Sequence, residues 1–130
     1  MLHRRSAGNT SSSHVNQAPV AVIPFAQCPA KTWLTPQGQS IPGRSVPEHC
    51  HIVGAVAQRL IALYPPALRS ALFPPDAAFA AACHDIGKVS PSFVEKLRRH
   101  CSSGTEHLPQ QAIAPELEKQ WGGHAGVSQA

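Results

Sequence analysis

A chain of 130 residues, of which 42% are hydrophobic, is long enough for one domain at most. Its formal net charge of +4 suits a polyanionic partner such as nucleic acid but is too small for a protein that coats DNA. No apolar run reaches the length of a membrane-spanning helix, and no signal-peptide core follows Arg4 and Arg5. The four cysteines are widely spaced without a C-x-x-C pair, so a reducing, cytoplasmic environment is expected.

The first third of the chain is expected to hold little regular structure. Residues 1–24 offer little to bury and predict a disordered or loosely packed N-terminal segment. The apolar run over residues 20–25 is interpreted either as an edge strand or as a segment that packs across the domain. Prolines and glycines recur through residues 27–44 and predict a loop. Lys31 and Trp33 are its most distinctive side chains.

A long helix is predicted over residues 47–64. Ser45 and Glu48 have the spacing of a capping box, and Pro47 is tolerated in the first turn of a helix. Two prolines at positions 65 and 66 then stop the helix.

One side of this helix is an apolar stripe that we expect to be buried. Its members recur at helical spacing and are Val53, Val56, Ala57, Leu60 and Tyr64. His49 precedes Val53 by four residues and therefore lies on the same stripe, whereas His51 points away from it.

The central motif of the chain follows at the end of a later helix. A short helix or turn over residues 67–73 leads to an alanine-rich helix over 77–86, which runs into the sequence His84-Asp85-Ile86-Gly87-Lys88. Gly87 is expected to take the left-handed conformation that closes a helix. This would place the imidazole and the carboxylate in the last turn, near the surface.

Short helices and loops are predicted for the remainder. A helix capped by Ser90 begins at Pro91 and ends near His100. The charges of Arg98, Arg99 and His100 suit the negative end of its dipole. A polar loop over 101–114 precedes a helix over 115–120, and residues 122–128 resemble the first turns of a further helix. Because the chain stops within those turns, we expect a domain that is incomplete at its C-terminus.

Four side chains on or beside three of the predicted helices form a candidate metal site. They are His49, His84, Asp85 and His124. Imidazole nitrogens together with a carboxylate suit a borderline divalent ion, and this set can complete one site and part of a second. The alternatives are a hydrogen-bonded core histidine at position 49, a plain Gly-Gly-His loop at position 124, and a simple pair between Asp85 and Lys88.

Four stretches of the chain resemble the HD nuclease domain of the CRISPR-associated helicase–nuclease of type I interference, a branch of the HD metal-dependent phosphohydrolases. The stretches are Ala30-Lys31-Thr32, residues 46–53 around His49, residues 84–93 from His84 to Phe93, and residues 123–128 around His124. The similarity covers about residues 25–130. Its most specific part is the His-Asp-x-Gly-Lys sequence followed by Phe93.

This resemblance implies an all-α helical bundle, with residues 25–130 forming a partial HD nuclease domain. It implies that His49, His84, Asp85 and His124 bind one or two divalent metal ions, with Asp85 as the bridging ligand. Asp85 and Lys88 would be the catalytic residues, with Lys88 contacting the phosphate. The implied activity is hydrolysis of single-stranded DNA, and the implied partners are a helicase domain and the CRISPR effector complex, with no membrane.

Other readings of the same residues stay open at the level of sequence. The chain is alternatively an HD phosphohydrolase acting on nucleotides, or a non-catalytic remnant that binds a metal or a protein. Lys88 is alternatively a solvated cation at a helix end, and Lys31 and Trp33 alternatively pack their loop against the domain. The remaining histidines are assigned to solvent: His3, His14, His51, His100 and His107.

Overall fold

The structure, a computed structural model, describes residues 21–111, 113, 115–120 and 122–129. Within that range, nothing is described for the side chains at positions 115, 117, 118, 124, 127 and 129. Most of the predicted N-terminal segment, residues 1–20, lies outside the described residues. The described part of the apolar run over 20–25 does not form an edge strand, and it leads instead into a short 3-10 helix, η1 (Phe25–Gln27).

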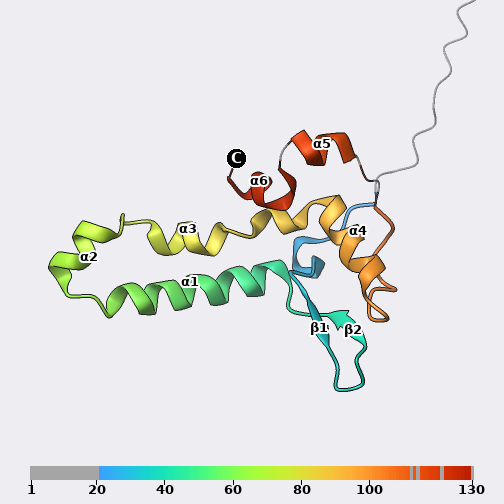
Figure 1. Cartoon of the computed structure of the whole chain (residues 1–130), viewed down its shortest axis with the longest axis horizontal. Helices are drawn as coiled ribbons and strands as arrows, with labels where there is room; N and C mark the ends of the chain where they lie inside the picture. The colour runs from blue at the N-terminus through green and yellow to red at the C-terminus, as the bar shows by residue number, and fades with distance from the viewer. Residues whose placement is uncertain (1–20, 112, 114, 121, 130) are drawn as a thin grey trace, which may run out of the picture.

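Two antiparallel helices form a long arm (Figure 1). Helix α1 (Val46–Ala62) runs out along this arm, α2 (Pro66–Leu72) turns the chain, and α3 (Ala77–Cys83) returns beside α1. Helices α1 and α3 approach closely because Gly54 of α1 has no side chain. A Cβ atom at position 54 would lie only 3.0 Å from the Cβ atom of Ala82.

The predicted start of α1 is confirmed. The backbone N–H of Ser45 donates to Oε2 of Glu48 over 2.9 Å, and the Ser45 side chain accepts from the backbone N–H of Glu48, so the capping box is complete. The helix ends at Ala62, two residues earlier than predicted, in front of Pro65 and Pro66.

The apolar stripe of α1 is less buried than predicted. Val53 and Ala57 are partly covered, but Val56 and Leu60 are 51% and 55% exposed. The reason is that α3 has only seven residues, most of them alanines, and such a short and narrow helix cannot cover the whole side of a 17-residue helix.

A β-hairpin replaces the loop predicted for residues 27–44. Strands β1 (Thr32–Leu34) and β2 (Ser40–Pro42) pair antiparallel, with Trp33 opposite Ile41. Pro36 and Gly38, which predicted the loop, belong to the turn that joins the strands. Gly38 has a φ of 77°, a backbone conformation that glycine adopts without steric cost.

The small core lies where the hairpin base, the start of α1 and helix α4 (Pro91–His100) meet. Its buried members are Cys28, Ala30, Val46, Val94 and Leu108. Helix α4 also carries Glu95, whose side chain is fully buried and accepts hydrogen bonds from Arg98, Arg99 and the backbone of Gln111. Arg98 and Arg99 therefore bind a buried carboxylate, in addition to lying in the last turn as predicted.

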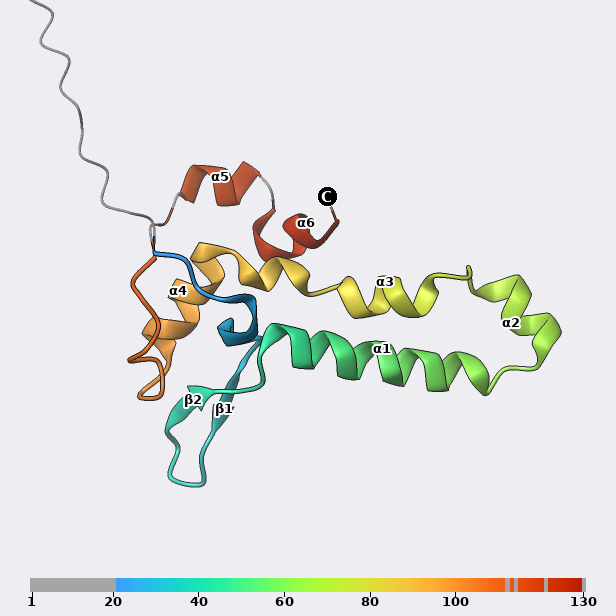
Figure 2. The same ribbon diagram turned by 180° about the vertical axis from the view of Figure 1, so that it is seen from behind.

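Two short helices complete the described chain, as predicted. Helix α5 (Pro115–Gln120) leads to α6 (Gly123–Gln129), which packs against the 3-10 helix η2 (Ile86–Val89), as both Figure 1 and the reverse view in Figure 2 show. The predicted mainly helical fold is thus confirmed, with the two-stranded hairpin as an addition. Within the described part of the chain, no helix combines the length and apolarity needed to cross a membrane.

Candidate metal centre

Two segments of the fold, the start of α1 and the junction between α3 and η2, deliver the side chains of the centre. His49 lies in the first turns of α1, His84 caps the C-terminus of α3, and Asp85 precedes η2. Helix α3 ends at Cys83, three residues earlier than predicted. Gly87 does not take the predicted left-handed conformation; it is buried within η2, which continues the turn without a positive φ.

One carboxylate oxygen is the focus of the centre. Oδ2 of Asp85 lies 3.0 Å from Nε2 of His49, 3.0 Å from Nε2 of His84 and 2.6 Å from Nζ of Lys88. One potential ligand atom from each of His49, His84 and Asp85 falls within 4.8 Å of the others. Two imidazole nitrogens and a carboxylate oxygen at this spacing are compatible with a single divalent ion.

The orientation of His84 is set by the backbone of its own helix. Its Nδ1 atom lies 2.8 Å from the carbonyl oxygen of Ala81, which only accepts hydrogen bonds, so Nδ1 carries a hydrogen. Nε2 then faces Oδ2 of Asp85, which as a carboxylate oxygen also only accepts. This contact is favourable if Nε2 carries a second hydrogen or if Nε2 and Oδ2 share a cation. The donor set therefore fits a divalent metal ion.

Asp85 is held in its ionised form. Burial alone would raise the pKa of its carboxyl group, but the hydrogen bond and the charge of Lys88, together with His84 and His49, hold that pKa below its ordinary value. An ionised carboxylate is the form that binds a metal.

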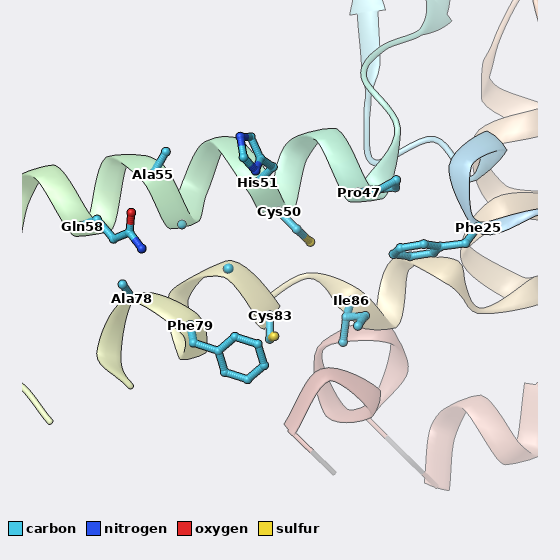
Figure 3. Close-up of a pocket in the computed structure, with 12 residues that line it drawn as sticks. Phe25, Pro47, Cys50, His51, Ala55, Gln58, Ala78, Phe79, Cys83 and Ile86 are labelled. Atoms are coloured by element: carbon cyan, nitrogen blue, oxygen red, sulfur yellow. The ribbon is translucent and has the colours of Figure 1, made fainter. Parts of the chain in front are cut away.

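The centre is open to solvent at His84 and closed at Asp85. The side chain of His84 is 47% exposed, whereas that of Asp85 is 14% exposed. Cys50 follows His49 in the sequence, and Cys83 precedes His84. Both cysteines line a pocket between α1 and α3, and Phe79 is another of its lining residues (Figure 3).

Lys88 is held in a defined position beside the centre. Its ammonium group is 2.6 Å from Asp85 and lies 5.7 Å from the centroid of the Phe93 ring, a favourable distance for a cation over an aromatic face. The alternative interpretation of Lys88 as a solvated cation at a helix end therefore does not hold, since its side chain is only 15% exposed.

The other residues singled out in the sequence lie elsewhere. His124 belongs to α6, but its side chain lies outside the described part of the structure, so its role as a ligand stays a prediction. Lys31 and Trp33 are exposed on the hairpin, and His51, His100 and His107 are exposed as expected.

Two supporting residues were not anticipated. Ala81 orients His84 through its carbonyl group, and the spacing of three residues within a helix was the available signal. Ser128 accepts a hydrogen bond from the backbone N–H of Gly87 over 2.8 Å, a contact across 41 positions that no local pattern indicates.

A mainly helical domain in which two imidazoles and a carboxylate converge from separate segments has the character of a metal-dependent hydrolase. The family model described as Cas3, HD domain matches residues 30–130, and the chain therefore belongs to this family. It is a family of metal-dependent nucleases and phosphohydrolases, as the sequence motifs predict. No curated protein and no solved structure matches the chain.

Proposed function

We propose that this chain hydrolyses phosphodiester bonds of single-stranded DNA in CRISPR interference, with one or two divalent metal ions held by His49, His84, Asp85 and His124. The observation that carries the proposal is the convergence of both histidines and Lys88 on one oxygen of Asp85. A cluster of this kind brings positive charge and metal ligands to one point, which a phosphodiester requires because it is itself anionic.

Asp85 and the two histidines would hold the metal through Oδ2 and both Nε2 atoms. When bound, a divalent ion lowers the pKa of water and neutralises charge on the phosphate. The carbonyl group of Ala81 keeps the Nε2 atom of His84 directed at the site. Asp85 is the ligand best placed to serve a second ion, because a carboxylate has two oxygens and can bridge two ions.

Lys88 would stabilise the phosphate. In the structure its ammonium group pairs with Oδ2 of Asp85, the same oxygen that would bind a metal. A metal held at this oxygen would share its negative charge, which would leave Lys88 less tightly paired. The ammonium group of Lys88 would then supply positive charge for a non-bridging oxygen of the substrate.

His124 is proposed as the fourth ligand from its place in the chain. It precedes Ser128 by four positions in α6, the spacing at which residues share a helix face. The side chain of Ser128 contacts Gly87, two residues after Asp85. Helix α6 is thus held beside the segment that carries the centre.

The proposal includes partners and a compartment. In keeping with the family, we expect a helicase domain to supply single-stranded DNA, the CRISPR effector complex to recruit both, and the reaction to take place in the cytoplasm. Association with these partners is tested by co-purification with each of them.

The activity is tested with the whole chain, stripped with EDTA and then supplied with manganese, nickel or magnesium. We expect metal-dependent cleavage of a labelled single-stranded oligonucleotide, its loss in Asp85→Asn, and unchanged cleavage in His51→Ala, a histidine on the same helix that lies outside the cluster. Hydrolysis of nucleotides without cleavage of DNA would instead establish a nucleotide phosphohydrolase. Metal binding without any hydrolysis would establish a non-catalytic metal protein.

A further inference from the structure

The net positive charge of this chain comes from its first 47 residues. Arg4, Arg5, Lys31 and Arg44 are the only charged residues before Glu48, and the 83 residues from Glu48 onward carry seven basic and seven acidic residues. The whole net charge of +4 therefore belongs to the segment that includes the β-hairpin. Within the described structure, Lys31 and Arg44 flank this hairpin, and both are exposed.

The hairpin has two different faces. Alternate residues of a strand point to opposite sides, so Ala30 and Thr32 lie on one face and Lys31 and Trp33 on the other. Ala30 is buried and Thr32 is partly buried, whereas Lys31 is exposed and Trp33 is 62% exposed. The ladder continues beyond β1, because the N–H of Gly43 donates to the carbonyl oxygen of Lys31 over 2.8 Å. A cation and an indole ring therefore stand side by side on an outer face.

Backbone hydrogen bonds fix the hairpin to the domain. The backbone N–H of Ser102 donates to the carbonyl oxygen of Ser40 over 2.7 Å, and the N–H of Val46 donates to the carbonyl oxygen of Cys28 over 2.7 Å. The second of these bonds joins the entry to β1 to the first residue of α1, three positions before His49. The hairpin is thus a firm projection anchored at the end of α1 that bears the metal ligand, and it extends away from α3 in both views (Figure 1, Figure 2).

We propose that the outer face of this hairpin, formed by Trp33 and Lys31 with Arg44 at its base, binds the single-stranded DNA substrate outside the metal centre. The indole ring would stack on an unpaired base, and the two cations would pair with the phosphates on either side. That the bound strand is a substrate rests on the proposed function; the binding itself does not.

The chemistry of the face favours a single-stranded nucleic acid over other partners. An exposed tryptophan next to a cation matches a base joined to a phosphate, and stacking needs a base that is free of its duplex. A buried role for Trp33 would demand cover from the rest of the chain, and the described residues leave most of its surface open. The absence of acidic residues before Glu48 removes repulsion of the phosphate backbone.

Binding is measured in EDTA, so that it does not depend on catalysis. A labelled single-stranded oligonucleotide is titrated with the chain and followed by anisotropy, and the fluorescence of Trp33 is read in a Trp121→Phe background. We expect quenching of Trp33 and a roughly 5- to 100-fold loss of affinity in Trp33→Ala, with most of it restored in Trp33→Phe. Lys31→Gln and Arg44→Gln should each reduce the salt dependence of binding by about 0.7 in log–log slope.

Leu34→Ala is the matched control, because Leu34 is the next residue of the same strand, is 68% exposed and lies on the opposite face. It should bind DNA within about twofold of the wild type. Equal affinity of Trp33→Ala and the wild type, equal losses in Trp33→Ala and Leu34→Ala, or no quenching of Trp33 would each overturn the inference. If Trp33 instead contacts a protein partner, DNA will not quench its fluorescence. Thermal melts monitored by circular dichroism establish that the variants are folded. The quenching of Trp33 in the Trp121→Phe protein tests the inference without any substitution in the hairpin.

The two proposals fail in different ways. If the chain binds DNA through Trp33 but cleaves nothing, the proposed nuclease function is wrong and the binding face stands. If the chain cleaves DNA and Trp33→Ala leaves KM unchanged, the binding face is wrong and the nuclease function stands. Where both are correct, Trp33→Ala raises KM and leaves kcat near its wild-type value, because the hairpin binds the strand away from the reacting phosphate.

Discussion

Nε2 of His49 lies 3.0 Å from Oδ2 of Asp85, although the two residues are 36 positions apart. The contact joins the start of α1 to the turn after α3 and makes one small cluster out of two helices. Nε2 of His84 and Nζ of Lys88 also contact Oδ2, so nitrogen atoms from three side chains surround this oxygen. Such a cluster depends on the spacing of the two helices as much as on its own side chains.

His49→Ala should weaken the binding of a divalent metal. Removing a residue that only supports a ligand costs about 10- to 100-fold in affinity, so loss of a proposed ligand should cost at least that much. The measurement is a titration of the EDTA-treated chain with manganese, by calorimetry or equilibrium dialysis. His51→Ala removes an exposed histidine from the same helix and should leave the affinity unchanged. Equal affinities in the wild type and in His49→Ala would exclude His49 as a ligand.

His84 should bind a metal through Nε2 while Nδ1 keeps its hydrogen. The reason is that Nδ1 is committed to the carbonyl oxygen of Ala81, 2.8 Å away. Long-range proton–nitrogen NMR spectra of the chain, recorded with and without zinc, report each ring nitrogen separately. The Nε2 resonance of His84 should move on addition of zinc, and both nitrogens of exposed His107 should stay in place. A shift confined to Nδ1 would contradict this geometry.

The close approach of α1 and α3 should make Gly54 sensitive to substitution. Gly54→Leu would force the helices apart, because a Cβ atom there already lies 3.0 Å from that of Ala82. We expect a loss of about 1–3 kcal/mol in the free energy of unfolding, measured with urea, together with weaker metal binding. Ala62→Leu adds the same side chain at the exposed end of α1 and should cost little. In a Gly54→Ala background, Ala82→Gly should restore the space and the stability.

Local patterns in the sequence predicted the helices but not the features that depend on long-range contacts. The pair Ser45 and Glu48 sets the start of α1 through neighbouring atoms, so its spacing was sufficient. Pro36 and Gly38 indicate a turn as readily as a loop, and the hairpin became evident only from the pairing of Trp33 with Ile41. A prediction of the hairpin needed weight on the β-forming residues Thr32, Trp33 and Ile41 beside those breakers.

The candidate site was likewise predicted from the sequence only in part. The motif that contains His84 and Asp85 was visible in the sequence, and the structure brings it to His49. The hydrogen bond from His84 to Ala81 and the contact of Lys88 with Phe93 depend on where α3 ends, and the helix was predicted to run three residues further. The metal-binding roles of His49, His84 and Asp85 and the catalytic roles of Asp85 and Lys88 remain predictions.

Ser128→Ala should loosen helix α6 from the centre. The hydroxyl group of Ser128 accepts the hydrogen bond of the Gly87 amide, and without it that buried amide loses its partner. We expect faster hydrogen exchange at Gly87 and a loss of about 1–3 kcal/mol in the free energy of unfolding. Ser128→Thr keeps the hydroxyl group and should preserve most of the protection. Unchanged exchange at Gly87 in Ser128→Ala would mean that the contact does not hold α6 in place.

The buried carboxylate of Glu95 should make the stability of the domain depend on pH in acid. Its hydrogen bond with Arg98 is the main cause that lowers the pKa, burial opposes it, and Arg99 and the Gln111 amide add to the lowering, so the pKa falls from 4.5 to about 2. A carboxyl group with a lower pKa in the folded state stabilises that state when it is ionised. This stabilisation is complete above pH 4.5 and is lost as the pH falls toward 2.

Glu95→Gln removes this ionisation and tests the argument. We expect a loss of about 2–3 kcal/mol in the free energy of unfolding at pH 7, and a difference from the wild type that shrinks as the pH is lowered from 5 to 3. Urea unfolding of both proteins across that range is the measurement. Arg98→Gln should cost more than Arg99→Gln, because Arg98 donates two hydrogen bonds and is 31% exposed against 63% for Arg99. A difference between wild type and Glu95→Gln that stays constant with pH would show that Glu95 acts through its shape and packing rather than its charge.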